Sequence, residues 1–334
     1  MNTLWRQWRL VVYGVACLLA ISAAAWSATP RPKRVRHFAP NANFDAKGDF
    51  LPAKAGFDIA DVSSRAQLDV LPNGAKGLVW IGQCNGVDAN FEKLVRSMIN
   101  HPKLFGFYLM DDPDPTGRWR VQCTASDLRA ESDWIHRRRP EALTFVALMN
   151  VGSSASPEFS PEYSPDNSHV DLFSIAPYPC RTGWAECDYA MIDRYIAASQ
   201  DAGFPLSRIV PTFQSFGGGE WRSDSGGGYR LPTSSELQTI LERWGRLAPA
   251  PAFDFAYSWG QQRSDDSLAA SPDLQAVFAR HNHEARPPAL LALGVERVHE
   301  RVRFNRPKPT RKSRVVQTRL KKSAQPIRIQ PRTL

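Results

Sequence analysis

The sequence predicts an α/β protein whose parallel strands close into a (β/α)8-type, TIM-like barrel. Short apolar runs with strand character alternate with amphipathic helical segments over most of the chain, which is the pattern of repeated βαβ units. No glycine-rich dinucleotide-binding turn follows the first strand, so a barrel is favoured over an open doubly wound sheet. We expect seven strands, at residues 56–62, 76–82, 105–110, 143–150, 170–178, 208–216 and 253–259.

A full barrel of this type needs an eighth strand. The segment before Gly56 offers two candidates, residues 35–38 and 44–50. A parallel crossover usually takes a dozen residues or more, and little room remains before Gly56. An incomplete or irregular barrel is therefore the alternative to a closed one.

The N-terminus has the composition of an export signal. Arg6 and Arg9 precede an apolar or small stretch at 10–26, and small residues follow it, as in cleavable signal peptides. An uncleaved anchor is the alternative, but 17 residues are at the short limit for a membrane span. We predict a secreted, periplasmic or cell-envelope protein with no transmembrane span once the signal is removed. The expected organisation is a signal peptide (1–27), a linker or lead-in (28–55), the barrel (56–283) and a basic disordered tail (284–334).

The net charge of +9 is concentrated at the C-terminus. Residues 301–334 hold eight Arg, four Lys and no acid, which leaves a net charge of −3 for the rest of the chain. Such blocks are usually disordered. The tail is either inert or a contact for anionic envelope polymers. Phe304 is its only aromatic residue, which argues against base stacking, and we predict no specific nucleic-acid partner.

Four cysteines lie outside the signal segment, an even number that suggests disulfides in an exported chain. Cys180 and Cys187 enclose a six-residue loop and pair most easily. Cys84 and Cys123 follow neighbouring predicted strands and would form the second bridge. A metal site is disfavoured because no CxxC or HExxH spacing is present, and we predict no metal and no cofactor.

The stretch LFGFYLMDDPDPTG (104–117) is the strongest candidate for a functional site. Its apolar run predicts a buried strand, which must end at Pro113 because proline cannot donate to the ladder. Asp111, Asp112 and Asp114 then lie beyond the carboxyl end of that strand, where α/β folds bind ligands. Burial of Asp112 beside Asp111 would raise its pKa and suit it as a general acid. The alternative is that these residues cap a turn or pair with Arg118 or Arg120.

Acids, amides and aromatic residues are predicted at the other strand ends. Carboxylates and amides bond hydroxyl groups, while indole and phenol rings stack on the C–H faces of sugars. This mixture favours a carbohydrate ligand. Asp58 and Asp61 are candidates for a second catalytic carboxylate, with turn capping as the alternative. The predicted sugar-positioning residues are Asn85, Asn150, Tyr178, Gln214, Trp259 and Gln261.

The run FGFYLMDDPDPTG resembles the "DEP" strand ends of glycoside-hydrolase-like (β/α)8 barrels. Together with GLVWIG, APYPC, IVPTFQSFGGG and FAYSWG, it resembles an uncharacterised family of exported bacterial proteins, over residues 55–283. The resemblance implies the barrel and carboxylate chemistry on glycosidic bonds. Two positions depart from the pattern: Asp112 stands where Glu is expected, and Gln214 stands where retaining relatives place a nucleophilic Glu.

The sequence therefore predicts an exported glycoside-hydrolase-like protein that acts on a polysaccharide or glycoconjugate. Asp112 is the predicted general acid, and Asp58, Asp61 or Asp111 supplies the second carboxylate. Because the amide of Gln214 cannot act as a nucleophile or base, the alternative is a non-catalytic glycan-binding or envelope-associated barrel.

Overall fold

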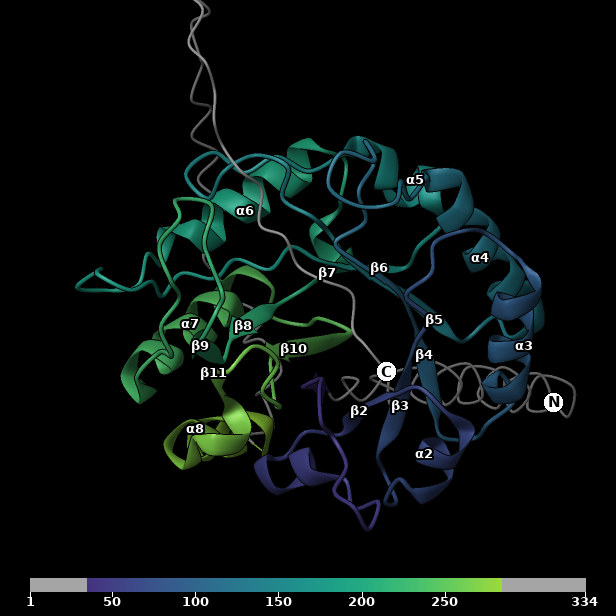
Figure 1. Ribbon diagram of the computed structural model, residues 1–334, viewed down its shortest axis with the longest axis horizontal. Helices are drawn as coiled ribbons and strands as arrows, with labels where there is room; N and C mark the ends of the chain where they lie inside the picture. Colours follow the sequence, from purple (N-terminus) through teal and green to yellow (C-terminus); the bar gives the residue numbers. More distant parts are fainter. Residues whose placement is uncertain (1–34, 284–334) are drawn as a thin grey trace, which may run out of the picture. The chain divides into compact units, whose positions relative to one another are not determined.

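The protein is a parallel barrel surrounded by helices (Figure 1), and its sheet has nine strands, two of which are the halves of one divided strand. The computed structural model describes residues 35–283; the predicted signal peptide, the first part of the predicted linker and the basic tail lie outside them. The sheet has the order β7-β6-β5-β4-β3-β2-β1-β10-β8, and each neighbouring pair is parallel. Its strands are β1 (Arg36–Phe38), β2 (Ile59–Val62), β3 (Lys76–Trp80), β4 (Leu104–Asp111), β5 (Leu143–Ala147), β6 (Leu172–Ser174), β7 (Ile209–Val210), β8 (Thr212–Gln214) and β10 (Phe253–Tyr257).

Pro211 divides the strand that closes the barrel. β7 and β8 are separated by this one residue; β7 pairs with β6 on one side and β8 with β10 on the other. Proline has no N–H to give to a neighbour, but its carbonyl oxygen accepts a hydrogen bond of 2.9 Å from the Phe255 amide. The two halves therefore act as one strand that joins the edges of the sheet, and the predicted barrel is confirmed.

The barrel begins earlier than the sequence predicted. Strand β1 lies within the segment that was expected to be a linker, at the first of the two candidate positions, and it pairs with β10 and β2. Residues 44–50 are not a strand and contribute one isolated bridge, between Phe44 and Phe50. The connection from β1 to β2 spans residues 39–58 and contains a 3-10 helix, η1 (Leu51–Ala55). Its 20 residues exceed the dozen that a parallel crossover usually takes, so the limited room expected before Gly56 does not prevent closure.

Side chains on the strands alternate between the barrel interior and the outer layer. On β5, Phe145 and Ala147 belong to the interior cluster and Val146 to the outer one. Aromatic rings fill the interior: the ring centroids of Phe145 and Phe253 are 5.2 Å apart. The interior is therefore a packed core, and ligands are expected at its end.

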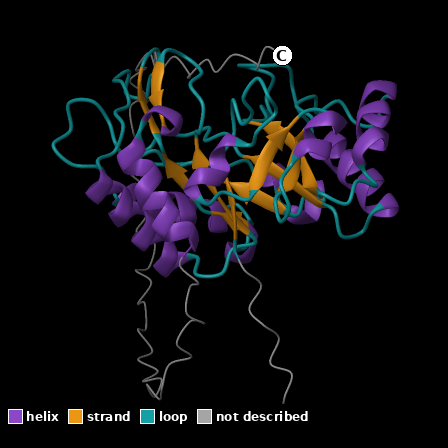
Figure 2. Ribbon diagram, turned by 90° about the horizontal axis from the view of Figure 1, so that it is seen from below, coloured by secondary structure: helices purple, strands orange, loops and turns teal. Residues whose placement is uncertain are grey.

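The helices cover the outside of the barrel, as Figure 2 shows. Capping boxes at Thr124 and Thr233 begin two of them, α4 and α7, by satisfying amides that have no partner within the helix. No helix among residues 35–283 is long and apolar enough to cross a bilayer. The helices are α2 (Arg65–Val70), α3 (Ala89–Met98), α4 (Ala125–Arg138), α5 (Pro165–Ser168), α6 (Ala190–Asp201), α7 (Ser234–Leu247) and α8 (Pro272–His283), with short 3-10 turns η2 (Pro161–Tyr163), η3 (Leu206–Arg208) and η4 (Leu268–Ala270).

The carboxyl ends of the strands and the loops that follow them form one end of the barrel, here called the mouth. An antiparallel ribbon of β9 (Phe216–Gly218) and β11 (Asp265–Ser267) belongs to this end. Both predicted disulfides are present, Cys84–Cys123 after β3 and β4 and Cys180–Cys187 after β6. They fasten loops at the mouth, where the chain has little regular structure of its own.

Candidate functional site

Asp111 and Asp112 lie at the mouth, at the end of β4. Asp111 is the last residue of the strand and is in register with Ala147 on β5. The Asp112 amide donates to the Ala147 carbonyl oxygen at 2.8 Å, and Asp112 has a left-handed backbone with φ of 49°. Pro113 then ends the pairing, as the sequence predicted. Such a conformation is uncommon for a residue other than glycine, and it turns the chain sharply beside two carboxyl groups.

The carboxyl group of Asp112 has a strongly perturbed pKa. Burial, followed by the neighbouring charge of Asp111, raises the pKa to about 8, and the guanidinium of Arg120 opposes the rise. The Arg120 Nη2 atom is 3.9 Å from the Asp112 carboxylate, of which a fifth is exposed. Asp111 is oriented separately, because the Tyr108 hydroxyl donates to its Oδ1 at 2.8 Å. At neutral pH Asp112 therefore keeps its proton, and its carboxyl group is partly exposed at the mouth.

The third acid of the run, Asp114, organises the loop. It is fully buried and accepts five hydrogen bonds from the amides of Thr116, Gly117, Trp119 and Arg120 and the Thr116 hydroxyl. These donors hold the pKa of Asp114 below its usual range despite burial. The folded loop brings Arg120 back to the strand end, where its Nη1 donates to the Asp111 carbonyl oxygen at 3.1 Å. Asp114 is thus the residue that positions Arg120.

Aromatic rings surround the two carboxyl groups. The ring of Tyr178 is stacked 5.9 Å from that of Tyr257, and its pKa is raised well above the usual value by burial and then by Tyr257, Asp111 and Asp112. Tyr178 therefore shares the mouth with both acids. The ring of Trp80, at the end of β3, meets the Tyr108 ring edge-on at 4.8 Å. Trp80 and Tyr178 are each partly exposed, so they can contact a ligand.

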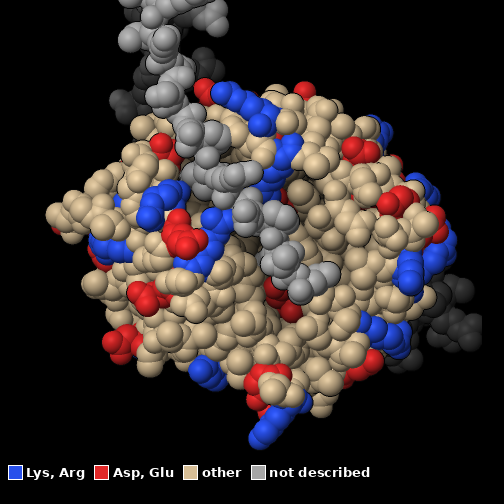
Figure 3. Space-filling model, viewed as in Figure 1, with Lys and Arg blue, Asp and Glu red and all other residues tan. Residues whose placement is uncertain are grey.

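Figure 3 shows one face of the molecule, with acidic atoms near its middle. Most of the surface around them is uncharged, and many Lys and Arg side chains lie toward the edge.

Asp58 and Asp61 occupy different ends of β2, which separates two residues that the sequence grouped together. Asp58 precedes the strand, at the end of the barrel opposite the mouth, and its carboxylate binds Arg36 and the His37 amide. The prediction that it lies at the mouth is wrong because the mouth is at the carboxyl end of β2, near Val62, and Asp58 precedes the strand. Asp61 is near the carboxyl end of β2, and its Oδ2 accepts a hydrogen bond from the Asn41 amide at 3.1 Å.

Gln214 and Trp259, predicted to position sugar, are fully buried. Gln214 exchanges hydrogen bonds with the Cys180 main chain and donates to the carbonyl oxygens of Phe216 and Arg230. The indole of Trp259 belongs to the outer core. An amide that is bonded to main chain and a ring that packs among helices cannot reach a ligand, so neither belongs to the candidate site.

Three further predicted residues stabilise loops at the mouth. The side-chain oxygen of Asn150 accepts from the amides of Gly152 and Glu158, and its nitrogen donates to the Tyr195 hydroxyl. Asn85 is exposed and donates to Asp88, the cap of α3. Gln261 is exposed and donates to the Asp265 carbonyl oxygen. Tyr178 alone of the six predicted sugar-positioning residues lies with the two acids.

Sequence reasoning did not assign Tyr108, Trp80 or Tyr257 to the site. Strand periodicity could have found Tyr108 and Trp80, because inward-facing residues near a strand end point toward the mouth. Tyr257 follows the same rule on β10, two residues from Phe255, which faces the interior.

No protein-family model matches the chain, and no curated protein matches it. Solved structures that resemble it include a fungal endo-beta-N-acetylglucosaminidase from glycosyl hydrolase family 18, with 14% identity, 76% of this chain and 98% of that chain covered, and a TM-score of 0.43. Catalytic domain 2 of an Ostrinia furnacalis Group II chitinase has 11% identity, 77% and 98% coverage and a TM-score of 0.49. A chitinase-like agglutinin from Robinia pseudoacacia has 13% identity, 72% and 98% coverage and a TM-score of 0.43.

These similarities are low in identity and in TM-score, and the assignment of the barrel rests on the strand order and register of this chain. The chain has a TIM-type parallel barrel. What it does at the mouth has to be argued from its own residues.

Proposed function

We propose that the mouth binds a glycan and that Asp112 protonates the oxygen of its glycosidic bond. One observation carries the proposal: burial and Asp111 raise the pKa of Asp112 to about 8. A carboxyl group that keeps its proton at neutral pH is the form that a glycosidase needs for its leaving-group acid. The partial exposure of Asp112 allows contact with a substrate.

Asp111 is the better candidate for the second carboxylate. It lies beside Asp112 and is oriented by Tyr108, whereas Asp58 lies at the other end of the barrel. An ionised Asp111 would stabilise the positive charge that develops on the sugar ring when the glycosidic bond breaks. Trp80 and Tyr178 would stack against sugar C–H faces.

The test is reducing-sugar release from a polysaccharide panel by the full chain. We expect Asp112→Asn to lower kcat by about 10²–10⁴-fold, the usual contribution of general acid catalysis. We expect wild-type kcat to fall as pH rises above about 8, where Asp112 loses its proton. Asp201→Asn, at an exposed position at the end of α6, is the matched control and should leave kcat unchanged. Equal cleavage by wild type and Asp112→Asn would refute the role of Asp112.

The second candidate is a barrel that binds glycans without cleaving them. It is favoured by the buried amide of Gln214, which cannot act as a nucleophile or base, and by the position of Asp58 at the opposite end of the barrel. This candidate predicts binding on a glycan array with no release of reducing sugar.

We also propose that the protein is exported. The support is the pair of disulfides, which persist in oxidising compartments. Cell fractionation with a thiol-labelling assay would test this: an exported chain has no free thiol at Cys84, Cys123, Cys180 or Cys187 and is recovered outside the cytoplasm. Deleting residues 284–334 and measuring retention on envelopes tests the proposed contact of the basic tail with anionic polymers.

A further inference from the structure

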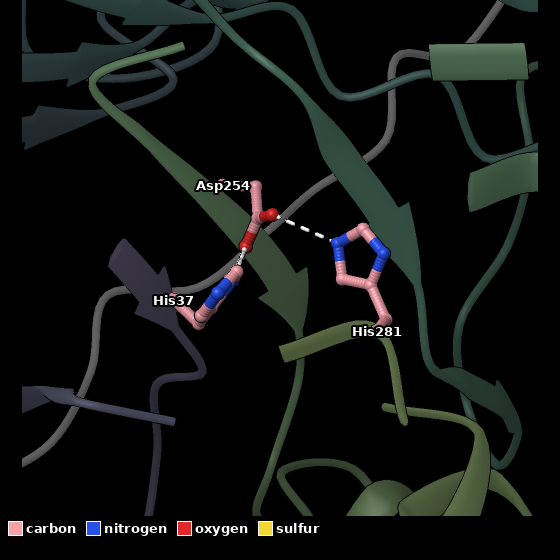
Figure 4. A group of neighbouring side chains, drawn as sticks. All are labelled: His37, Asp254 and His281. Carbon is pink, nitrogen blue, oxygen red and sulfur yellow. Dashed lines mark hydrogen bonds and ion pairs between the residues drawn. The ribbon is translucent and has the colours of Figure 1, made fainter. Parts of the chain in front are cut away.

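Two histidines and an aspartate meet in a buried cluster on the outer side of the barrel wall (Figure 4). The Asp254 carboxylate lies between two imidazole rings: its Oδ1 is 2.8 Å from His37 Nδ1 and its Oδ2 is 3.0 Å from His281 Nε2. The exposed fractions of the side chains are 5% for His37, 1% for Asp254 and 13% for His281.

Strand register and helix packing bring the three residues together. His37 on β1 is directly opposite Asp254 on β10. Their chain neighbours Phe38, Phe253 and Phe255 face the barrel interior, so His37 and Asp254 face outward. His281 on α8 meets them from the helix layer, with its ring 5.7 Å from that of Phe213. The cluster is therefore separated from the mouth by the wall of the barrel.

We propose that His37, Asp254 and His281 form a structural zinc site. Imidazole nitrogen and carboxylate oxygen are ordinary zinc ligands, with bonds of about 2.0–2.2 Å. The donor atoms of the three residues lie within 4.8 Å of one another. His37 Nδ1 and His281 Nε2 face different oxygens of the Asp254 carboxylate. If both oxygens bind the ion, Asp254 supplies two ligand atoms, and the two nitrogens bring the number to four.

Zinc binding requires His37 Nδ1 and His281 Nε2 to be free of protons. Each ring then carries its proton on the other nitrogen when the metal is bound.

The ion would join the beginning and the end of the described barrel, since β1 and β10 are neighbouring strands and α8 is the last helix. A second group of potential ligands, Cys180, Cys187 and Glu236, does not qualify, because its two cysteines form a disulfide. The His37–Asp254–His281 cluster is thus the better metal site among the described residues.

The experiment measures zinc bound to the full chain after chelator treatment and dialysis against ZnCl₂, by elemental analysis and by competition with a chromophoric chelator. We expect one zinc per wild-type chain and a melting temperature that rises with zinc. His37→Gln and His281→Gln should each weaken binding by more than about 100-fold, because even outer-shell partners of a metal cost 10–100-fold.

His136→Gln is the matched control, since His136 forms a comparable pair of 2.8 Å with Asp171 and should bind zinc as the wild type does. Two results would overturn the proposal: a wild-type chain that binds no zinc, which leaves a hydrogen-bonded cluster only, or equal zinc binding by wild type and both variants. If one variant fails to fold, the zinc content of the wild-type chain still decides between a zinc site and a hydrogen-bonded cluster.

Discussion

Asp112 at the mouth and Asp254 on the outer wall are both largely shielded from water, yet folding moves their pKa values in opposite directions. For Asp112, burial and the like charge of Asp111 act together, and the pKa rises to about 8. For Asp254, two imidazoles oppose the effect of burial, and the pKa falls below its usual range. One region holds a proton at neutral pH, and the other holds a negative charge.

The comparison shows that the neighbours of a carboxyl group, more than its depth, decide its protonation state. Asp114 supports this, because it is fully buried only a few residues from Asp112 and its pKa is lowered by amide and hydroxyl donors. A raised pKa is suited to proton donation, whereas a lowered pKa is suited to a stable ion pair, a turn or a metal ligand.

The largest expected effect is a loss of stability when the negative charge of Asp254, on the outer wall of the barrel, is removed. Asp254→Ala leaves two buried imidazoles without their partner, and breaking a buried pair in this way costs about 3–5 kcal/mol. Urea unfolding at pH 7 in the presence of a chelator measures it. Asp133→Ala is the control: Asp133 pairs with His169 at 2.7 Å, but both side chains are about a third exposed, so the cost should stay below about 1 kcal/mol. Equal losses in the two variants would contradict the importance of burial.

A smaller loss is expected at Asp114. In Asp114→Asn one acceptor oxygen becomes an amide, which leaves two main-chain N–H groups unpaired at a cost of about 1–3 kcal/mol. Urea unfolding measures the loss. Asp45→Asn is the control at an exposed site. One oxygen of Asp45, Oδ1, accepts from the Lys47 and Asp49 amides, and the Asn side chain keeps this acceptor, so little stability should be lost. A cost at Asp114 no larger than at Asp45 would show that the loop does not depend on its carboxylate.

Asp112→Asn should gain stability at alkaline pH. The folded chain keeps a proton on Asp112 that the unfolded chain releases above about pH 3.9, so this group lowers the free energy of unfolding as pH rises toward 8. The neutral Asn variant escapes this loss. We expect the free energy of unfolding of Asp112→Asn to exceed that of the wild type by at least about 1 kcal/mol at pH 9. This difference should narrow toward pH 5. If the difference in the free energy of unfolding, measured with urea, does not depend on pH, the pKa of Asp112 is not raised.

The smallest effect concerns Arg120, whose charge lowers the pKa of Asp112. In Arg120→Gln that pKa should rise further, and the alkaline limb of the activity profile should move to higher pH. The proton then stays on Asp112 over a wider pH range. Arg118→Gln, at an exposed neighbouring position, is the control. A shift of the limb to lower pH would contradict the assigned role of Arg120.

The alternation of strands and helices, both disulfides and the buried strand before the two acids could be predicted from the sequence, because they depend largely on local patterns. Apolar runs, helix spacing and cysteine separation are properties of short segments. Asp58 shows the limit of such reasoning: the mouth lies at the carboxyl end of β2, and Asp58 precedes Ile59, the first residue of that strand, so it lies at the opposite end of the barrel.

The roles of polar side chains could not be predicted. Gln214 had the right residue type and the right place after a strand, but its amide is bonded to the Cys180, Phe216 and Arg230 main chains. Two of these partners, Cys180 and Arg230, are 34 and 16 positions away along the chain and meet Gln214 only in the folded structure. Whether an amide binds a ligand or a loop depends on which groups fold over it.

By itself, the sequence determined that strands and helices alternate and that two acids follow a buried strand. Only the tertiary structure decided that Pro211 divides the closing strand, that Arg120 returns to Asp111, and that His37 and Asp254, 217 positions apart, lie side by side. The physical reason is that electrostatic and packing energies depend on distance in space. Closure of the barrel sets those distances between residues that are remote along the chain.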